Sequence, residues 1–282
     1  MKAETIRACS IWRALEVVGD VPVLLIMERA FLGTNRFELF VEQTSLPRSV
    51  VSARLKKLVE NDCLARVRRP PARRHIYVLT TKGRDLFGIA LMMLRWQHRW
   101  EPRAREFRVD LVHRGCGGSI EPVPVCAACD TEIDPRAVSW REGPGLAQVT
   151  PTYGRRRRLT EAVAGRRSTG TLIDTVIELF GDRWATLVVR AAFTGIHRFD
   201  DIQRDTLMAT NILAGRIERL VAQGILRAVP YSNHPDRFDY KLTEKGLDLY
   251  PVILGLLQWG DRWYADERGR RCCSAMCRAA MT

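Results

Sequence analysis

The sequence has no long hydrophobic run and no recognisable export signal. None of its 282 residues belongs to a stretch of roughly 18 consecutive apolar residues, the length that a membrane-spanning helix needs. The strongest candidate, Val21–Met27, is short and flanked by charge. The opening residues MKAETIRACSIW lack the apolar core of a signal peptide. We therefore expect a soluble protein of the cytoplasm with no membrane partner.

Catalytic motifs and acidic residues are also scarce. Nothing resembles a phosphate-binding loop, a nucleophile elbow or a paired-carboxylate site, which predicts that the protein is not an enzyme. The 45 Lys and Arg residues outnumber the 32 Asp and Glu residues, so the formal net charge is +13. A chain this basic favours a polyanionic partner, either nucleic acid or an anionic membrane surface.

One pattern is present twice. RSVVSARLKKLVENDCL, from Arg48 to Leu64, and TNILAGRIERLVAQGIL, from Thr210 to Leu226, keep the same apolar positions and differ at the charged ones. The two stretches lie 162 positions apart, whereas the offset is 163 from Leu79 and its counterpart Leu242 onward. Because single-residue insertions are tolerated in turns, the sequence predicts a hairpin tip between Val67 and Leu79.

Each copy predicts the same order of elements. An opening helix is followed by two further helices, then by the repeated stretch, whose apolar residues recur at helical spacing. Two short strands around a turn follow, and a last helix begins directly after them. In the two copies the opening helix spans Trp12–Val18 and Leu172–Phe180, the hairpin spans Leu64–Thr80 and Leu226–Thr243, and the last helix starts at Thr80 and Thr243. This order defines a winged helix-turn-helix.

The fold class that follows is mainly α with small β-wings (α+β). Two winged helix-turn-helix domains are joined by a basic linker that contains cysteines. The predicted boundaries are 9–107 for copy one, 108–136 for a Cys/His knuckle, 137–168 for a flexible basic linker, 169–267 for copy two, and 268–282 for a tail with cysteines.

Short motifs recur in the same order in both copies. Copy one has Cys-Ser-Ile-Trp-Arg-Ala-Leu from Cys9, then Gly-Asp, Arg-Phe, Ser-Ala-Arg-Leu, Leu-Thr-Thr-Lys-Gly and a closing Trp-x-x-x-Trp. Copy two has Gly-Asp-Arg-Trp, Arg-Phe, Leu-Thr-Glu-Lys-Gly and Trp-Gly-Asp-Arg-Trp. This set resembles the HxlR-type winged-helix transcriptional regulators. Copy one departs from that family at Val21-Pro22, where Arg or Lys followed by Trp is expected.

The resemblance implies a DNA-binding protein of the bacterial nucleoid. Members of the family carry one such domain per chain and act as dimers on pseudo-palindromic operators. A fused pair could mimic that dimer within one chain as an intramolecular pseudo-dimer, or the two copies could pair between chains as a homodimer.

The predicted DNA contacts follow from the docking geometry of the fold. The N-terminal part of the recognition helix enters the major groove, and the wing contacts the backbone. Because Asn pairs with adenine and Arg with guanine, the two copies should read different half-sites. The alternative is a solvated basic face. The candidate residues are Arg36, Arg48, Ser49, Ser52, Arg54, Lys56, Arg68, Arg69, Arg73 and Arg74 in copy one, and Arg183, Arg198, Thr210, Asn211, Arg216, Arg219 and Arg237 in copy two.

Within this set, Arg54 and Arg216 are predicted to contact phosphate. The wing of copy one is much richer in arginine than the wing of copy two, so copy one should contribute more of the salt-dependent affinity. Arginine runs in the linker suggest either a solvated tether or a segment that follows phosphates.

A metal-ligand pattern follows copy one. His113, Cys116, Cys126 and Cys129 combine a His-x-x-Cys arm with a Cys-x-x-Cys turn, and four such ligands can hold structural Zn²⁺. A dithiol redox pair and unliganded thiols are the alternatives. Cys9 aligns with a cysteine that some members of the family use as a thiol sensor, although a packed helix residue is the favoured explanation because sensing needs a lowered thiol pKa.

These observations predict a sequence-specific DNA-binding transcriptional regulator, acting as a repressor on a pseudo-palindromic operator in double-stranded DNA. One alternative is a sensor that responds to an oxidant or a small-molecule inducer through Cys9 or an inter-domain pocket. Another is a winged-helix module for protein–protein interaction.

Overall fold

A computed structural model of the chain describes residues 6–68, 75–101, 111–142, 147–149, 173–231, 237–265, 272–274 and 279–280. The chain forms two compact units. Unit 1 comprises Met1–Glu16, Val112–Pro151 and Asp182–Thr282, and unit 2 comprises Val17–Leu111 and Thr152–Gly181. The units are described separately below.

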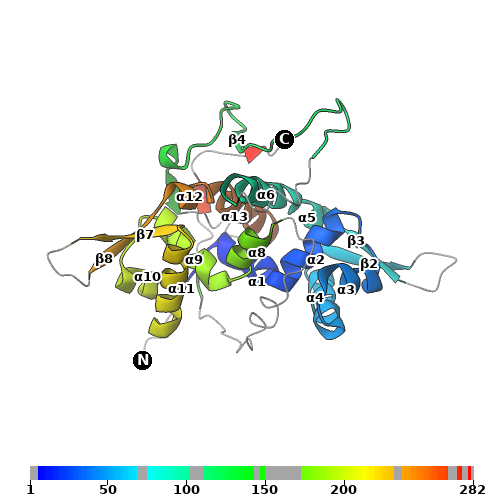
Figure 1. Cartoon of the computed structure of the whole chain (residues 1–282), viewed down its shortest axis with the longest axis horizontal. Coiled ribbons are helices and arrows are strands. Elements are labelled where there is room, and N and C mark those ends of the chain that lie inside the picture. The colour runs from blue at the N-terminus through cyan, green and yellow to red at the C-terminus, as the bar shows by residue number, and fades with distance from the viewer. Residues whose placement is uncertain are drawn as a thin grey trace. The chain divides into compact units, whose positions relative to one another are not determined.

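Unit 2 contains the helix-turn-helix of copy one. Helix α4 buries Val51, Leu55 and Leu58, which recur every three or four residues and so form one apolar face. In Figure 1 the helices α2 to α4 lie beside the β2–β3 hairpin. The elements are α2 (Val21–Phe31), α3 (Phe37–Thr44), α4 (Arg48–Glu60), β2 (Leu64–Arg68), β3 (His75–Leu79), α5 (Thr81–Arg84), α6 (Phe87–Trp100) and α8 (Asp174–Phe180).

Unit 1 contains the helix-turn-helix of copy two in the same order. Helix α11 buries Leu213, Ile217 and Leu220, and Gly224 follows the helix at φ +68°, a conformation that suits glycine after a helix end. The elements of this copy are α9 (Arg183–Phe193), α10 (Phe199–Thr206), α11 (Thr210–Ala222), β7 (Leu226–Pro230), β8 (Phe238–Leu242), α12 (Glu244–Leu247) and α13 (Tyr250–Tyr264). The fold class predicted from the sequence is therefore confirmed.

The hairpins explain the change of offset between the copies. In copy one the paired strands run from Leu64 opposite Leu79 to Arg68 opposite His75, which leaves residues 69–74 for the tip. In copy two the last pair is Pro230 with Phe238, which leaves residues 231–237. The tip of copy two is thus one residue longer, and the extra residue lies in the turn, as predicted.

The last helix was predicted as one element and is two. A single turn, α5 or α12, follows the hairpin, with Thr80 or Thr243 as its N-cap. The long helix begins only at Phe87 or Tyr250. The short turn packs against the backbone between α4 and β2, since a Cβ on Gly83 would lie 2.0 Å from the carbonyl oxygen of Cys63. The chain must redirect after this contact, which separates the two helices.

Unit 1 also holds the opening helix of copy one up to Glu16, and unit 2 holds the opening helix of copy two. Helix α1 (Ser10–Val18) approaches α13 so closely that a Cβ on Gly260 would lie 2.1 Å from the carbonyl oxygen of Ser10. In unit 2 the side-chain amide oxygen of Gln97 accepts a hydrogen bond from the backbone N–H of Val176, at 3.2 Å and buried. Each unit is therefore completed by a helix from the other copy.

The remaining described elements belong to unit 1. They form short antiparallel pairs between β1 and β6, β4 and β10, and β5 and β9. Their bounds are β1 (Ile6–Ala8), β4 (Val125–Cys126), β5 (Trp140–Glu142), β6 (Ala147–Val149), β9 (Cys272–Ser274) and β10 (Ala279–Ala280), with a 3₁₀ helix η2 at Pro135–Ala137. Residues 150–172, which hold most of the predicted linker, lie outside the described residues, and the predicted domain boundaries stay a prediction.

Across the described ranges, none of the helices combines the length and the apolar character that crossing a bilayer would require.

The close contact at Gly246 yields a test of the wing-to-helix junction. A Cβ at this position would lie 2.2 Å from the backbone carbonyl oxygen of Ile225, so Gly246→Ala forces the backbone to move. We expect the free energy of unfolding to fall by about 2 kcal/mol, measured by urea denaturation. Gly215→Ala is the matched control, because nothing lies within 4 Å of its Cβ and the residue is in the middle of α11. The control should stabilise by about 0.5–1 kcal/mol, and equal effects of the two substitutions would contradict this account.

Candidate nucleic-acid interface

Each recognition helix exposes the face opposite its buried stripe. On α4, Ser49, Ser52 and Lys56 are exposed, and Lys56 keeps 77% of its side-chain surface. On α11, Thr210 and Asn211 are exposed. Neither helix is covered along this face by the described part of its unit. A double strand can therefore reach both helices, which the DNA-binding prediction requires.

An aspartate at the start of the second helix of each copy, α2 or α9, pairs with cations of the recognition helix. In copy one, Asp20 is the N-cap of α2 and accepts a hydrogen bond from the backbone N–H of Val23, at 3.0 Å. The same carboxylate lies 3.0 Å from the Nε of Arg54 and 3.8 Å from the Nζ of Lys57, both on α4. Asp20 is buried and carries a negative charge at the N-terminus of α2. It therefore interacts favourably both with the positive end of the helix dipole and with the two cations of α4.

Copy two repeats this arrangement with the equivalent residues. Asp182 caps α9 by accepting hydrogen bonds from the backbone N–H groups of Trp184 and Ala185, at 3.0 and 3.3 Å. Its other oxygen lies 2.5 Å from the Nε of Arg216 and 3.8 Å from a guanidinium nitrogen of Arg219. One carboxylate thus joins the second helix of the copy to the recognition helix in both copies.

This role of the aspartates was not predicted from the sequence. The Gly-Asp dipeptide served only as a mark of the repeat, and Arg54, Arg216 and Arg219 were predicted to contact DNA. The signal was present, since Asp20 and Arg54 recur together as Asp182 and Arg216 at one offset. The structure gives these arginines a carboxylate partner inside the domain, and any phosphate contact by them stays a prediction.

The other predicted contacts of copy one lie at the surface. Arg48 is 65% exposed, lies 3.6 Å from Glu38 and stacks over the ring of Phe37. Arg36 is exposed at the start of α3, and Arg68 is exposed at the end of β2. Arg69, Arg73 and Arg74 lie outside the described residues.

Several predicted contacts of copy two have partners within unit 1. Arg183 stacks on the rings of Trp12 and Trp184, with its guanidinium carbon 4.8 and 5.1 Å from the ring centroids. Arg198 lies 3.8 Å from Asp239 and stacks over Tyr231. These contacts make Arg183 and Arg198 part of the domain surface rather than freely extended cations.

The remaining candidates of copy two are a hydroxyl and a wing arginine. The hydroxyl of Thr210 lies 2.9 Å from the side-chain nitrogen of Gln203, and Arg237 is exposed beside the tip of the wing.

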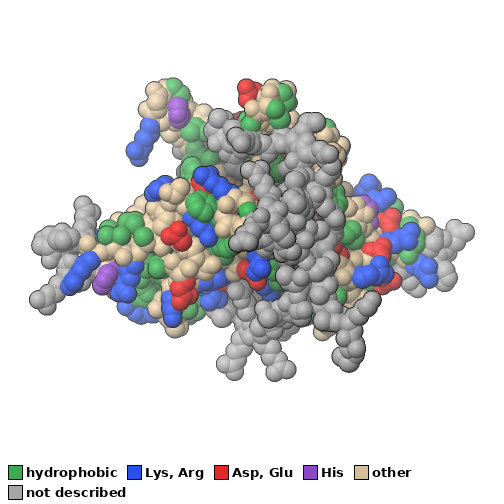
Figure 2. Space-filling view, turned by 180° about the vertical axis from the view of Figure 1, so that it is seen from behind, with side chains coloured by type: hydrophobic (Ala, Val, Ile, Leu, Met, Phe, Trp, Pro, Cys, Tyr) green, Lys and Arg blue, Asp and Glu red, His purple; other side chains and the backbone are tan. Residues whose placement is uncertain are grey.

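The surroundings of the two wings differ in charge. Figure 2 shows Lys and Arg side chains gathered beside the β2–β3 hairpin, whereas acidic and basic side chains are mixed around the β7–β8 hairpin. In copy one, Arg66 lies 3.2 Å from His75 across the hairpin. The described part of the wing of copy one carries Arg66 and Arg68, whereas that of copy two carries Arg227, Arg237 and Lys241 beside Asp239. The greater positive charge predicted for the wing of copy one depends on Arg69, Arg73 and Arg74, which lie outside the described residues.

The predicted metal ligands form two separate pairs. The Nδ1 of His113 lies 3.2 Å from the Sγ of Cys116 on one turn, where Gly117 adopts φ +71°. Cys126 and Cys129 lie on a second turn, in which the backbone N–H groups of Cys129 and Asp130 donate to the carbonyl of Cys126. Both turns suit metal ligation in residue type and shape. Within the described residues, however, no three His, Cys, Asp or Glu side chains are placed to hold one ion, and zinc stays a prediction.

Two further cysteines differ in environment. Cys9 is half-buried, and its sulfur lies 3.3 Å from a guanidinium nitrogen of Arg190, which is itself ion-paired with Asp205. Cys63 is buried, and burial raises the pKa of its thiol to about 11, so this residue remains a neutral packing group at physiological pH. A sensing role of Cys9 stays a prediction.

Two recognition helices, each paired with a buried aspartate and followed by a wing, define a pair of winged helix-turn-helix DNA-binding domains. Residues 17–105 and 179–268 match the family model described as HxlR-like helix-turn-helix, and these two regions make up more than half of the chain. The chain therefore belongs to the HxlR family, and it is a transcriptional regulator of the helix-turn-helix class.

Similar proteins carry the same description. The chain is 38% identical over 138 residues to the uncharacterised HTH-type transcriptional regulator Rv3095 of Mycobacterium tuberculosis, which covers 49% of this chain and 87% of that protein. It is 31% identical over 97 residues to the uncharacterised HTH-type transcriptional regulator sll1512 of Synechocystis, covering 34% of this chain and 71% of the other. Among solved structures, the candidate transcription factor PA1607 is 31% identical, with a TM-score of 0.42, and covers 45% of this chain and 89% of its own.

The shared aspartate gives a prediction for copy two. Asp182→Asn retains an N-cap oxygen but loses the charge that attracts Arg216 and Arg219, so the free energy of unfolding should fall by about 1 kcal/mol. Asp182→Ala also loses the cap and should lower it by about 2 kcal/mol, measured by urea denaturation. Asp201→Asn is the control, because Asp201 forms only a partly exposed pair with Arg204. An effect of Asp182→Ala no larger than that of the control would argue against the anchoring role.

The zinc prediction can be tested by metal content. We expect the purified chain to retain about one Zn²⁺, measured by a colorimetric chelator after denaturation, because four N and S ligands suit a structural site. Cys129→Ser should lower the zinc content sharply, while Cys9→Ser, outside the pattern, should leave it unchanged. Absence of zinc from the full-length protein, or equal zinc in the two variants, would remove the site.

Proposed function

We propose that this regulator is a sequence-specific repressor that binds a pseudo-palindromic operator through both recognition helices. The observation that supports this most directly is the shared architecture of α4 and α11. Each helix has an arginine that forms an ion pair with a buried aspartate, and its N-terminal part exposes a polar face. Because rigid positioning of the recognition helix sets which bases its side chains reach, this anchor supports sequence-specific reading.

The operator is expected to be asymmetric in detail. At equivalent positions α4 presents Arg48 and Ser49, while α11 presents Thr210 and Asn211. Arginine pairs best with guanine and asparagine with adenine, so the two half-sites should differ at the bases that these residues face. A protein that occupies two half-sites also excludes other proteins from the DNA between them, which is the physical basis for repression.

The two copies contribute unequally to the electrostatic part of binding. Copy one carries Arg66 and Arg68 in its wing and exposed Lys56 on its recognition helix. Copy two has Ala228 opposite Arg66 in the alignment and Glu218 opposite Lys56. Since phosphate contacts release counterions, copy one is expected to dominate the salt dependence of the affinity.

The electrostatic proposal is tested by replacing the wing arginines of copy one. Arg66→Ala with Arg68→Ala should reduce the slope of log affinity against log salt by about 2, since each phosphate contact contributes about 0.9. Affinity is measured by fluorescence anisotropy on a labelled duplex over a range of salt concentrations. Arg114→Ala is the control, because this arginine is exposed but lies outside both copies. If the double variant keeps the original slope, the wing of copy one does not contact the backbone.

The specificity proposal is tested with a selected binding site. We expect Asn211→Ala to relax the preference at one base step by about tenfold and to leave the salt slope unchanged. Selection of bound sequences from a random duplex pool supplies the site, and competition with single-base variants measures the preference. If the full-length protein retains no duplex at moderate salt, sequence-specific repression is excluded and a protein-binding module becomes the better explanation.

A further inference from the structure

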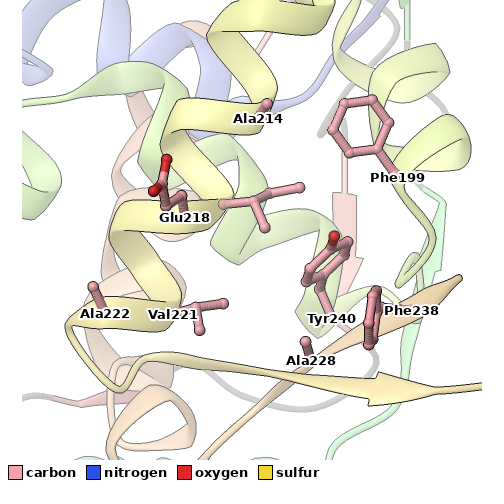
Figure 3. A pocket seen from close by; sticks show the side chains of 9 residues that line it. Phe199, Ala214, Glu218, Val221, Ala222, Ala228, Phe238 and Tyr240 are labelled. Carbon is pink, nitrogen blue, oxygen red and sulfur yellow. The ribbon is translucent and has the colours of Figure 1, made fainter. Parts of the chain in front are cut away.

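Copy two has a cleft of about 520 Å³ between its recognition helix and its wing. Three aromatic side chains line it, with Phe199 from the start of α10 and Phe238 and Tyr240 from β8. Glu218 and small apolar residues of α11 form the opposite wall (Figure 3). All these residues belong to unit 1. The volume lies in the range of small-molecule sites, which are apolar with a few placed polar groups.

The equivalent surface of copy one has a different chemistry. Ser52 corresponds to Ala214, Lys56 to Glu218, Arg66 to Ala228 and His75 to Phe238, at the offsets of the repeat. In copy one, Arg66 and His75 contact each other across the hairpin at 3.2 Å. Copy two therefore replaces two large polar side chains by a methyl group and a phenyl ring. Two of the three rings have aromatic counterparts in copy one, since Phe37 matches Phe199 and Tyr77 matches Tyr240, so the two surfaces differ chiefly in side-chain size and charge.

The charge of the cleft is negative. Glu218 is exposed, and no hydrogen bond or ion pair of its carboxylate is found within the described residues. No Lys or Arg lines the cleft. Burial raises the pKa of Tyr240, so its phenol is neutral at physiological pH and its ring remains an aromatic wall. Carboxylates and aromatic faces both attract cations, and a phosphate backbone would be repelled by the carboxylate.

We propose that this cleft binds a small organic cation with a flat aromatic body. The rings of Phe199, Phe238 and Tyr240 contact the aromatic body, and Glu218 pairs with the positive charge. The assignment rests on the shape and charge of the cleft and is independent of DNA binding, because none of its arguments uses a DNA contact. Because copy one has Lys56 and Arg66 where copy two has Glu218 and Ala228, the ligand is expected to act on copy two only.

The test uses two dyes with the same xanthene body and opposite charge. Rhodamine 6G is a cation and fluorescein is an anion, and binding of each to the full-length chain is measured by fluorescence anisotropy without DNA. The net charge of +13 would favour fluorescein if binding were unspecific. We expect rhodamine 6G to bind at least tenfold more tightly than fluorescein. Equal binding of the two dyes, or tighter binding of fluorescein, would overturn the proposal.

Variants locate the site. Glu218→Gln should weaken rhodamine binding about tenfold, and Glu218→Lys or Ala228→Arg, which introduce the residues of copy one, should abolish it. Glu60→Gln is the matched control, because it removes an exposed carboxylate from the recognition helix of copy one. Both glutamates are exposed, so neither change should affect thermal unfolding, which is checked by circular dichroism. Unchanged rhodamine affinity in Glu218→Lys would place the dye elsewhere and overturn the proposal.

Two further measurements, of DNA retention and of dimerisation, separate small-molecule binding from DNA binding and from self-association. Retention of duplex DNA is measured on the same chain without substitutions. Absence of rhodamine 6G binding with DNA retained rejects the cleft alone, while rhodamine 6G binding without DNA retention rejects the proposed function alone. Concentration-dependent dimerisation abolished by Ala228→Arg would assign the surface to a second copy of the chain and overturn the small-molecule proposal.

Discussion

The recognition surface depends on one carboxylate in each copy. Asp20 and Asp182 cap the second helix of their copies and attract the cations of the helix that would read DNA. A single side chain therefore satisfies the N-terminal backbone donors of one helix and fixes the position of another. The exposed residues that differ between α4 and α11 lie on helices that an aspartate holds in the same way in both copies. These residues can therefore change without altering the fold.

The outer residues have diverged in opposite directions. Copy one presents Lys56 on α4 and Arg66 on its wing, whereas copy two presents Glu218 and Ala228 at the corresponding positions. Because the buried stripe of α11 repeats that of α4, this divergence is a change of surface chemistry on a preserved core. Duplication permits it, since one copy can supply electrostatic affinity while the other is free to acquire a more selective contact.

The sequence predicted the elements better than the contacts between them. Periodicity and the repeat were enough to predict the two copies, the exposed face of α4 and the hairpin whose tip contains the extra residue. The partner of Arg54 did not, because an arginine opposite an apolar stripe can equally face solvent or a carboxylate 34 positions earlier. The break before Phe87 was missed since it depends on the contact between Gly83 and the carbonyl of Cys63. The cleft was missed because it requires the spacing of α11 and β8 in three dimensions.

The opening helices have a different consequence. Helix α8 is part of the unit that contains copy one, and α1 up to Glu16 is part of the unit that contains copy two. Cutting the chain between the copies would thus strip each half of a helix, leaving the buried Gln97 and the close-packed Gly260 without their neighbours. A fragment that holds one copy alone would therefore lack part of the compact unit around it, so the two copies depend on each other for folding.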